Sequence, residues 1–295
     1  MPIVHLDNRA LIDLSGPEAE HFLQNIVTTD LTGLGASEAL SGALLTPQGK
    51  ILFDFLVSRH GKDGLRLECR DDIADDFVRR LTLYRLRAKV GINKQDQHIV
   101  AVEWQSDSTP SSADSTSSAK ENGVRDRRFS GAIVKRHYDP PLPQADASVA
   151  EWTAFRVDEG IAESGVDYAL GDAFPHDVLL DQTCGVGFRK GCYIGQEVVS
   201  RMQHRGTARR RVLIARATLP LPVPGSEITV NGRPIGTLGS VAGATGLAIA
   251  RIDHVKDAID SGTQILAGNT AVTLSIPQWA KFGFPEDKAA SGGKH

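Results

Sequence analysis

Residues 185–202 read GVGFRKGCYIGQEVVSRM, a stretch in which a glycine-rich loop leads into a predicted helix that starts at Gln196. Glycine permits positive φ angles and a close approach between backbone segments. We therefore expect a bend that places Cys192 just before or at the N-terminus of this helix, two residues after Lys190. The glycines of the bend are Gly185, Gly187, Gly191 and Gly195.

Cys192 is the predicted reactive residue of this bend. Free N–H groups at a helix N-terminus and nearby cations, here Lys190 and Arg189, favour a thiolate over a thiol. The alternative is that Cys192 is a small buried hydrophobic residue, that Lys190 is a solvated charge and that the glycines only shape a turn. The spacing of these residues is compatible with both interpretations.

The first 70 residues predict a unit of one helix and several strands. Residues 10–14 form a predicted strand, which is followed by a helix with Ser15 as its cap and Pro17 in its first turn. Two apolar runs flank the turn at 47–50, and a third run covers 65–69. Such runs, separated by turn residues, predict a meander of strands.

A second helix is predicted next in the chain. Residues 71–87 carry apolar side chains with a 3.6-residue period, and Asp71 can cap this helix. Strands are then predicted at 89–96 and 97–104. The fold class is therefore α+β, with helices packed on a largely antiparallel sheet.

The last part of the chain predicts a β-barrel. Short runs rich in Val, Ile and Thr alternate with Gly, Pro and Asn, and Asn231-Gly232 between two apolar runs indicates a hairpin. The serine-rich stretch 105–123 has almost no apolar side chains and predicts a solvated loop, with a phosphorylated or partner-binding tract as the alternative. The predicted domains are an α+β region of two intertwined lobes at 1–206, the barrel at 207–285 and a flexible tail at 286–295.

Composition limits the function classes. The net charge of −3 predicts no general affinity for nucleic acid or for an anionic membrane, and no apolar window is long enough to span a bilayer. Three cysteines without a CxxC motif and nine scattered histidines predict no resident metal site. The N-terminus lacks the pattern of a signal or transit peptide, so we expect a cytoplasmic protein.

The segment KGCYIGQE resembles the signature of YgfZ-type folate-binding proteins, which are relatives of the glycine-cleavage T-protein, an aminomethyltransferase. Further segments occur in the order typical of that family, and the resemblance covers nearly the whole chain outside the serine-rich stretch. These segments are HFLQNIVTTDL, LTPQGKILFDFLV, FRVDEGIAESG, FPHDVLLDQ and GTARRRVL.

The resemblance implies mixed α+β lobes around a central folate pocket, followed by a terminal β-barrel. It also implies a tetrahydrofolate-dependent accessory role in the assembly or repair of iron-sulfur proteins, with assembly factors or client proteins as partners. Two alternatives remain: a folate-dependent aminomethyl or one-carbon transferase, and an RNA-binding scaffold linked to tRNA modification. The near-neutral net charge makes the RNA-binding role the least favoured.

Functional residues are carried over from the family by position. Cys192 and Lys190 are the predicted reactive, or catalytic, side chains, and Cys192 could ligate a transient iron-sulfur cluster shared with a partner, because one cysteine cannot hold a cluster alone. The other signature positions are predicted to bind the folate: Gly191, Tyr193, Gly195, Gln196 and Glu197.

Three further positions are predicted to contact the folate. In FRVDEG the T-protein supplies a carboxylate to the pterin, and this position is Asp158, with Arg156 as its neighbour. A carboxylate suits a pterin because it accepts two adjacent N–H donors together. In GKILFDF the T-protein has two adjacent carboxylates, whereas this chain has Phe53 and then Asp54, which weakens the case for aminomethyl transfer.

A basic run lies beside these positions. Arg201, Arg205 and residues 209–211 could form a cationic rim for the anionic polyglutamate tail of a folate. A solvated face or an RNA contact would give the same pattern.

Overall fold

A computed structural model describes residues 1–96, 99–106, 123–206 and 208–285, without the side chains of Ser106 and Arg205. Most of the serine-rich stretch and the whole predicted tail lie outside the described residues. The elements in chain order are β1 (Ile3–Leu6), β2 (Arg9–Ser15), α1 (Ala19–Gln24), η1 (Leu31–Gly33), β3 (Glu38–Leu45), β4 (Ile51–His60), β5 (Gly64–Arg70), α2 (Asp71–Arg85), β6 (Gly91–Lys94), β7 (Val100–Ser106), β8 (Val124–Asp126), β9 (Ala132–His137), α3 (Val149–Asp158), α4 (Gln196–Arg205), β10 (Arg210–Arg216), β11 (Glu227–Val230), β12 (Arg233–Ala242), β13 (Thr245–Arg251), α5 (Ile252–Ser261), β14 (Ile265–Ala267) and β15 (Thr270–Ser275).

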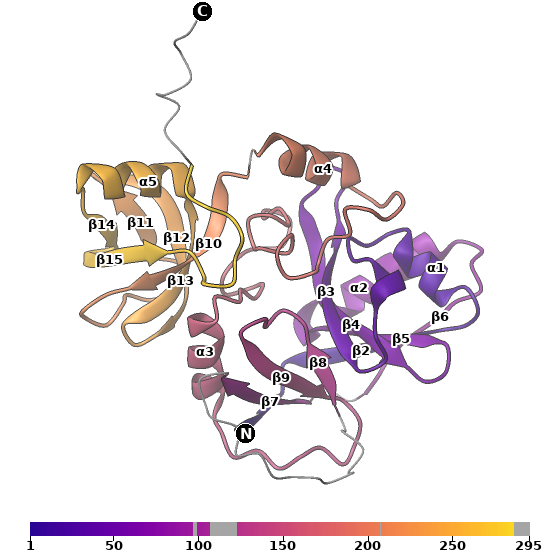
Figure 1. The fold of residues 1–295 in the computed structure, drawn as a ribbon. Helices are drawn as coiled ribbons and strands as arrows, with labels where there is room; N and C mark the ends of the chain where they lie inside the picture. The colour runs from indigo at the N-terminus through magenta and orange to yellow at the C-terminus, as the bar shows by residue number, and fades with distance from the viewer. Residues whose placement is uncertain (97–98, 107–122, 207, 286–295) are drawn as a thin grey trace, which may run out of the picture.

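The α+β region is built on one nine-stranded sheet, in the order β1-β7-β9-β8-β3-β4-β5-β2-β6 (Figure 1). Every adjacent pair is antiparallel except β3 and β8, which run parallel. The predicted α+β class with a largely antiparallel sheet is therefore confirmed.

Two predicted helix caps are wrong. Ser15 is the last residue of β2, and the chain turns at Gly16, whose φ of +110° lets it pass the Lys89 carbonyl before α1 begins at Ala19. Asp71 is the first residue of α2, but no side chain caps this helix at Arg70, and the Asp71 carboxylate instead lies 3.4 Å from the Lys94 ammonium.

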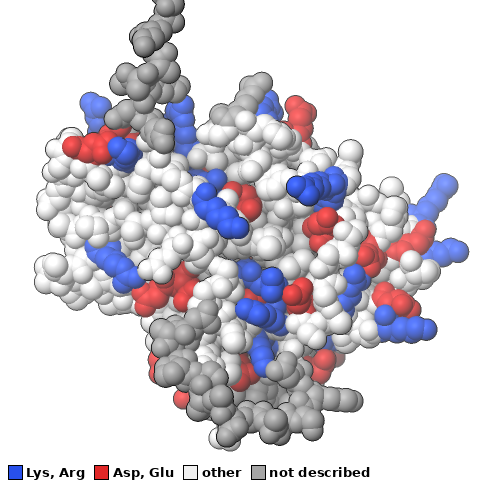
Figure 2. All heavy atoms as spheres, viewed as in Figure 1, with Lys and Arg blue, Asp and Glu red and all other residues white. Residues whose placement is uncertain are grey.

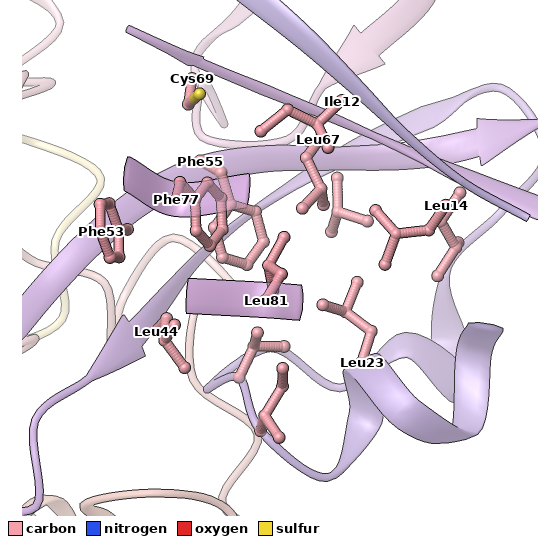
Figure 3. Packing of buried hydrophobic residues seen from close by; sticks show 14 of the residues in the cluster. Ile12, Leu14, Leu23, Leu44, Phe53, Phe55, Leu67, Cys69, Phe77 and Leu81 are labelled. Carbon is pink, nitrogen blue, oxygen red and sulfur yellow. The ribbon is translucent and has the colours of Figure 1, made fainter. Parts of the chain in front are cut away.

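Helix α2 provides the main apolar contact on one face of the sheet. Its buried side chains are Ala74, Phe77 and Leu81, which recur at the predicted helical spacing. The Phe77 ring stacks on Phe53 and Phe55 of β4, with ring centroids 4.8 Å and 5.6 Å apart (Figure 3). This aromatic stack fixes the face of β4 that points away from the centre of the molecule, so the neighbouring Asp54 points to the opposite face.

Strands β10 to β15 close into a barrel, in the order β10-β13-β12-β11-β14-β15. The predicted hairpin is present, because Asn231 and Gly232 take positive φ angles of +50° and +74° between β11 and β12. Helix α5 was not predicted, since only strands were expected here. Its buried residues Ile252, Val255 and Ala258 pack on the barrel core.

Replacing Phe77 with alanine should lower the free energy of unfolding by about 3–5 kcal/mol, because a large cavity would replace the aromatic stack. Urea denaturation measures this change. Leu83→Ala on the same helix is the matched control, since Leu83 is 63% exposed and its replacement should cost less than about 0.5 kcal/mol. Equal effects of the two substitutions would contradict the assigned packing.

Candidate functional site

A central cavity lies between the inner face of strands β2, β4 and β5 and the segment 160–183. Its walls include Arg9, Asp54 and Glu163, and Trp279 reaches it from beyond the barrel. The free volume is about 40 Å³, which is room for a few water molecules. A larger guest therefore enters only if wall side chains move.

A network of buried ion pairs lies beside this cavity, and its members Arg9, Glu68 and Glu163 line the cavity. Arg136 on β9 is fully buried and lies 3.0 Å from the Glu68 carboxylate and 3.2 Å from the Asp126 carboxylate. The Arg9 guanidinium lies 3.2 Å from Glu68 and 2.9 Å from Glu163. Charges taken out of water are tolerated when they are paired in this way.

Glu163 is the ionised acid of the cavity wall. Burial by itself raises the pKa of a carboxyl group, but the cations of Arg9 and Arg156 outweigh it and hold the pKa of Glu163 well below its usual range. Glu163 is therefore a carboxylate at neutral pH and can accept hydrogen bonds from a guest.

Asp54 is the only predicted folate-binding residue that lines the described part of this cavity. Its carboxylate accepts hydrogen bonds from the Ser164 hydroxyl at 2.7 Å and from the Tyr168 hydroxyl at 3.0 Å. Because these two donors fix the carboxylate, Asp54 is oriented before any guest arrives. Phe53, which stands where the T-protein has a second acid, packs in the apolar core against Phe77.

The structure does not place Asp158 in the cavity. Asp158 is exposed at the end of α3, where it lies 3.3 Å from the Arg216 guanidinium. Arg156 is buried instead, and it donates to Asp167 at 2.8 Å and to the Ser240 hydroxyl on β12. Side chains two positions apart on a helix differ in direction by about 200°, so Asp158 faces outward when Arg156 is buried. Sequence reasoning missed Glu163, although it lies in the same acidic segment, FRVDEGIAESG.

The glycine-rich loop does not line the described part of this cavity, and its position at a folate pocket stays a prediction. Of the signature residues, none is among the described residues that line the cavity. Helix α4 begins at Gln196, four residues after Cys192, and the Cys192 side chain is exposed. The thiol is therefore open to solvent and to a partner, rather than sealed in the core.

Lys190 and Tyr193 attach this loop to the rest of the molecule. The Lys190 ammonium donates to the carbonyls of Val27 at 2.8 Å and Thr29 at 2.7 Å. Burial lowers the pKa of Lys190 to about 8, and Asp30 opposes this decrease. Tyr193 is buried beneath the loop, and this burial raises the pKa of its hydroxyl to about 12.

The remaining signature residues form the start of α4. Gly195 has a φ of +77°, and a Cβ there would lie 2.6 Å from the Thr46 carbonyl, so only glycine fits. The Gln196 amide is 3.5 Å from the Gly191 carbonyl, and the exposed Glu197 is 3.8 Å from Arg201 on the next turn. These positions have local structural roles, and the folate contacts predicted for them stay predictions.

The arginines of the basic run whose side chains the structure describes lie beside carboxylates. Arg211 is buried and pairs with Asp181 at 2.7 Å, while Arg210 lies 3.5 Å from Asp172. Arg209 is 3.9 Å from Asp253. Figure 2 shows basic and acidic side chains interspersed over the face in view. Within the described ranges, this pattern favours a solvated surface over a nucleic-acid contact.

The part of the chain that the structure describes contains neither a candidate metal cluster nor a candidate membrane span. No group of three or more His, Cys, Asp or Glu side chains could hold a metal ion there. Among the same residues, no helix is both long and apolar enough to cross a membrane.

Comparison with known proteins supports the fold and suggests a functional class. Residues 209–282 match the family model described as CAF17, C-terminal beta-barrel domain. The chain is 28% identical to the mouse iron-sulfur cluster assembly factor IBA57, mitochondrial, over 93% of this chain and 84% of that protein. It is 29% identical to the IBA57 homologue of Pyricularia oryzae, over 85% and 72% of the two chains.

The crystal structure of the glycine cleavage system aminomethyltransferase T from Bartonella henselae has the same fold. It superposes with a TM-score of 0.69 over 95% of this chain and 86% of that chain, at 14% sequence identity. The predicted T-protein-like fold with a C-terminal barrel is thus confirmed. The relatives named here are IBA57 proteins, and the resemblance to YgfZ-type proteins in particular stays a prediction.

The prediction of a cytoplasmic protein is contradicted. The mouse and Pyricularia oryzae relatives are both named as mitochondrial proteins.

Replacing Arg136 with methionine should lower the free energy of unfolding by about 3–5 kcal/mol, because Glu68 and Asp126 would lose a buried partner. Urea denaturation at pH 7 measures the change. Arg79→Met is the control, since the Arg79–Asp76 pair is largely exposed and its loss should cost less than about 1 kcal/mol. A small effect at Arg136 would count against the network as a stabilising unit.

Lys190 should titrate near pH 8 rather than at its ordinary value of 10.5. Between these two pH values the folded chain has released the proton and the unfolded chain has not, so stability rises with pH. The difference in unfolding free energy between the wild-type protein and Lys190→Met should therefore move in favour of the wild type across this window. Denaturation at several pH values checks it, and a curve that is flat from pH 8 to 10.5 would refute the assignment.

Proposed function

We propose that this protein is an accessory factor in the assembly or repair of iron-sulfur proteins, which binds tetrahydrofolate in the central cavity and presents Cys192 to a partner. The observation that carries the proposal is the pairing, within a T-protein-like fold, of a polar central cavity with an exposed thiol on an anchored loop. The names of the IBA57 relatives support the iron-sulfur role.

The chemistry of the cavity wall fits a reduced pterin. Asp54 and Glu163 are hydrogen-bond acceptors for the ring N–H and amino donors of a pterin, and Arg9 is a donor for its carbonyl oxygen. Tetrahydrofolate carries one-carbon units when it is bound. Trp279 is half-buried at the cavity and donates to the Glu159 carbonyl at 2.6 Å, and this hydrogen bond would have to break if the indole ring moved to admit the pterin.

Cys192 fits a role in handling an iron-sulfur cluster as cargo. A thiolate is a soft ligand suited to iron, and an exposed position allows a second protein to supply the other ligands. Cys69 does not fit this role, because it is buried and its burial raises the pKa of its thiol to about 12.

Aminomethyl transfer is the less supported function. Transfer chemistry of the T-protein type was expected to use adjacent carboxylates, and here Phe53 occupies the second position inside the aromatic stack. Asp54 remains the single acid on this strand segment, and both of its carboxylate oxygens already accept hydrogen bonds. An accessory role without turnover therefore accounts better for the cavity.

Asp54→Asn and Glu163→Gln should each weaken tetrahydrofolate binding about 10- to 100-fold, which corresponds to the loss of a hydrogen bond to a charged group. Isothermal titration calorimetry measures this, with circular dichroism to show that each variant is folded. Asp158→Asn is the matched control and should bind normally, because Asp158 is exposed and paired with Arg216. Folded wild-type protein that binds no tetrahydrofolate would end the folate part of the proposal.

The thiol is tested separately in cells. Cys192→Ala should bind tetrahydrofolate like the wild type but fail to restore iron-sulfur enzyme activities in a strain that lacks this protein. Cys184→Ala, which removes the other exposed thiol, is the matched control. Full complementation by Cys192→Ala would exclude a role for this thiol.

A further inference from the structure

The loop of residues 184–192 is attached to a buried segment, residues 27–29, by backbone and side-chain hydrogen bonds. The Gly187 N–H donates to the Thr28 carbonyl at 2.8 Å, and the Thr28 hydroxyl donates to the Gly185 carbonyl at 2.6 Å. Lys190 adds its two bonds to the carbonyls on either side of Thr28. The first half of the loop is thus held by the backbone, whereas the second half is held by one side chain.

The segment that receives these bonds is itself fixed. Val27, Thr28 and Thr29 are fully buried. The Thr28 N–H donates to the Ala43 carbonyl at 2.9 Å, and the Thr29 hydroxyl donates to the Ser41 carbonyl at 2.7 Å, so both residues are attached to β3. The Lys190 ammonium, which donates to this segment, is therefore linked through it to the central sheet.

The path of the Lys190 side chain depends on a glycine. A Cβ added at Gly187 would lie 2.8 Å from Cδ of Lys190 and 2.8 Å from Cβ of Asp30, so the lysine stem passes where any larger residue would collide. Asp30 and Tyr193 are the other titratable groups that face Lys190, with the ammonium 5.3 Å from the centre of the Tyr193 ring. The glycine spacing of the loop and the lysine contact are thus parts of one arrangement.

Beyond Lys190 the loop has no comparable attachment until Tyr193. Gly191 and Cys192 are both exposed, and no heavy atom lies within 4 Å of a Cβ built at Gly191. The position of Cys192 is therefore set by the attached residues on either side of it, Lys190 two positions before and the buried Tyr193 directly after.

We propose that Lys190 is a positioning residue, whose ammonium fixes the loop on residues 27–29 and so holds Cys192 at a defined place on the surface. This replaces the reactive role expected for Lys190, because an ammonium that donates to two carbonyls is not a free nucleophile. The biological significance of the arrangement depends on the proposed function of Cys192, but the arrangement itself can be tested without folate or iron.

The test uses the full chain with Cys184→Ser, so that Cys192 is the exposed thiol that takes a nitroxide spin label while Cys69 stays buried. In this background Lys190→Met should make the label more mobile in its electron paramagnetic resonance spectrum. It should also speed amide exchange at Gly187 by about tenfold or more, since loss of the anchor favours local opening. Exchange in β13 should be unchanged.

Two further variants separate the positioning role from others. Lys190→Arg retains a cationic donor for the two carbonyls, so it should keep exchange within about threefold of the parent and restore iron-sulfur enzyme activities in cells. Arg189→Met, which removes the adjacent exposed cation, should change neither the mobility of the label nor the amide exchange at Gly187.

Unchanged label mobility and Gly187 exchange in Lys190→Met would overturn the proposal. A Lys190→Arg variant whose label is as mobile as that of Lys190→Met would also overturn it. If Lys190→Met does not fold, the Lys190→Arg result decides. Failure of tetrahydrofolate binding or of the Cys192→Ala test would leave these spectroscopic results unaffected, so the two proposals fail independently.

Discussion

The site depends on the neutralisation of carboxylates that the fold has removed from water. Glu68 and Asp126 are buried on the large sheet, and Arg136 pairs with both. From this pair the charges continue through Arg9 to Glu163 at the cavity wall. Unpaired charges at these depths would cost several kcal/mol each, so the loss of one partner would destabilise the carboxylates beside the cavity.

The same network reaches the barrel. Arg156 donates to Asp167, and Asp167 accepts from the backbone N–H of Ser240 on β12 at 2.6 Å. Gly239 makes this contact possible, because a Cβ there would lie 2.3 Å from the Asp167 carboxylate. The barrel is thus attached to the wall of the cavity by polar contacts as well as by apolar packing, and it contributes to the site without supplying a reactive group.

The cavity and the exposed thiol are separate places that share strand β3. Ser41 and Gly42 line the cavity, while the carbonyls of Ser41 and Ala43 hold the segment on which Lys190 rests. A guest in the cavity would contact β3 directly, whereas Cys192 is linked to β3 only through Lys190 and residues 27–29. None of the described residues that line the cavity belongs to the glycine-rich signature.

The sequence by itself determined the fold class, the barrel and the hairpin at Asn231-Gly232, because these follow from local periodicity, turn chemistry and a specific motif, whereas the exposure of Cys192 was left open. Only the tertiary structure decided which acid enters the cavity, since helix phase turned Asp158 outward and long-range ion pairs with Arg9 brought Glu163 inward. It also decided the role of Lys190, whose acceptors lie more than 160 residues earlier in the chain. Contacts between residues so far apart in the chain produce no periodic pattern in a single sequence, so they can be identified only from the folded structure.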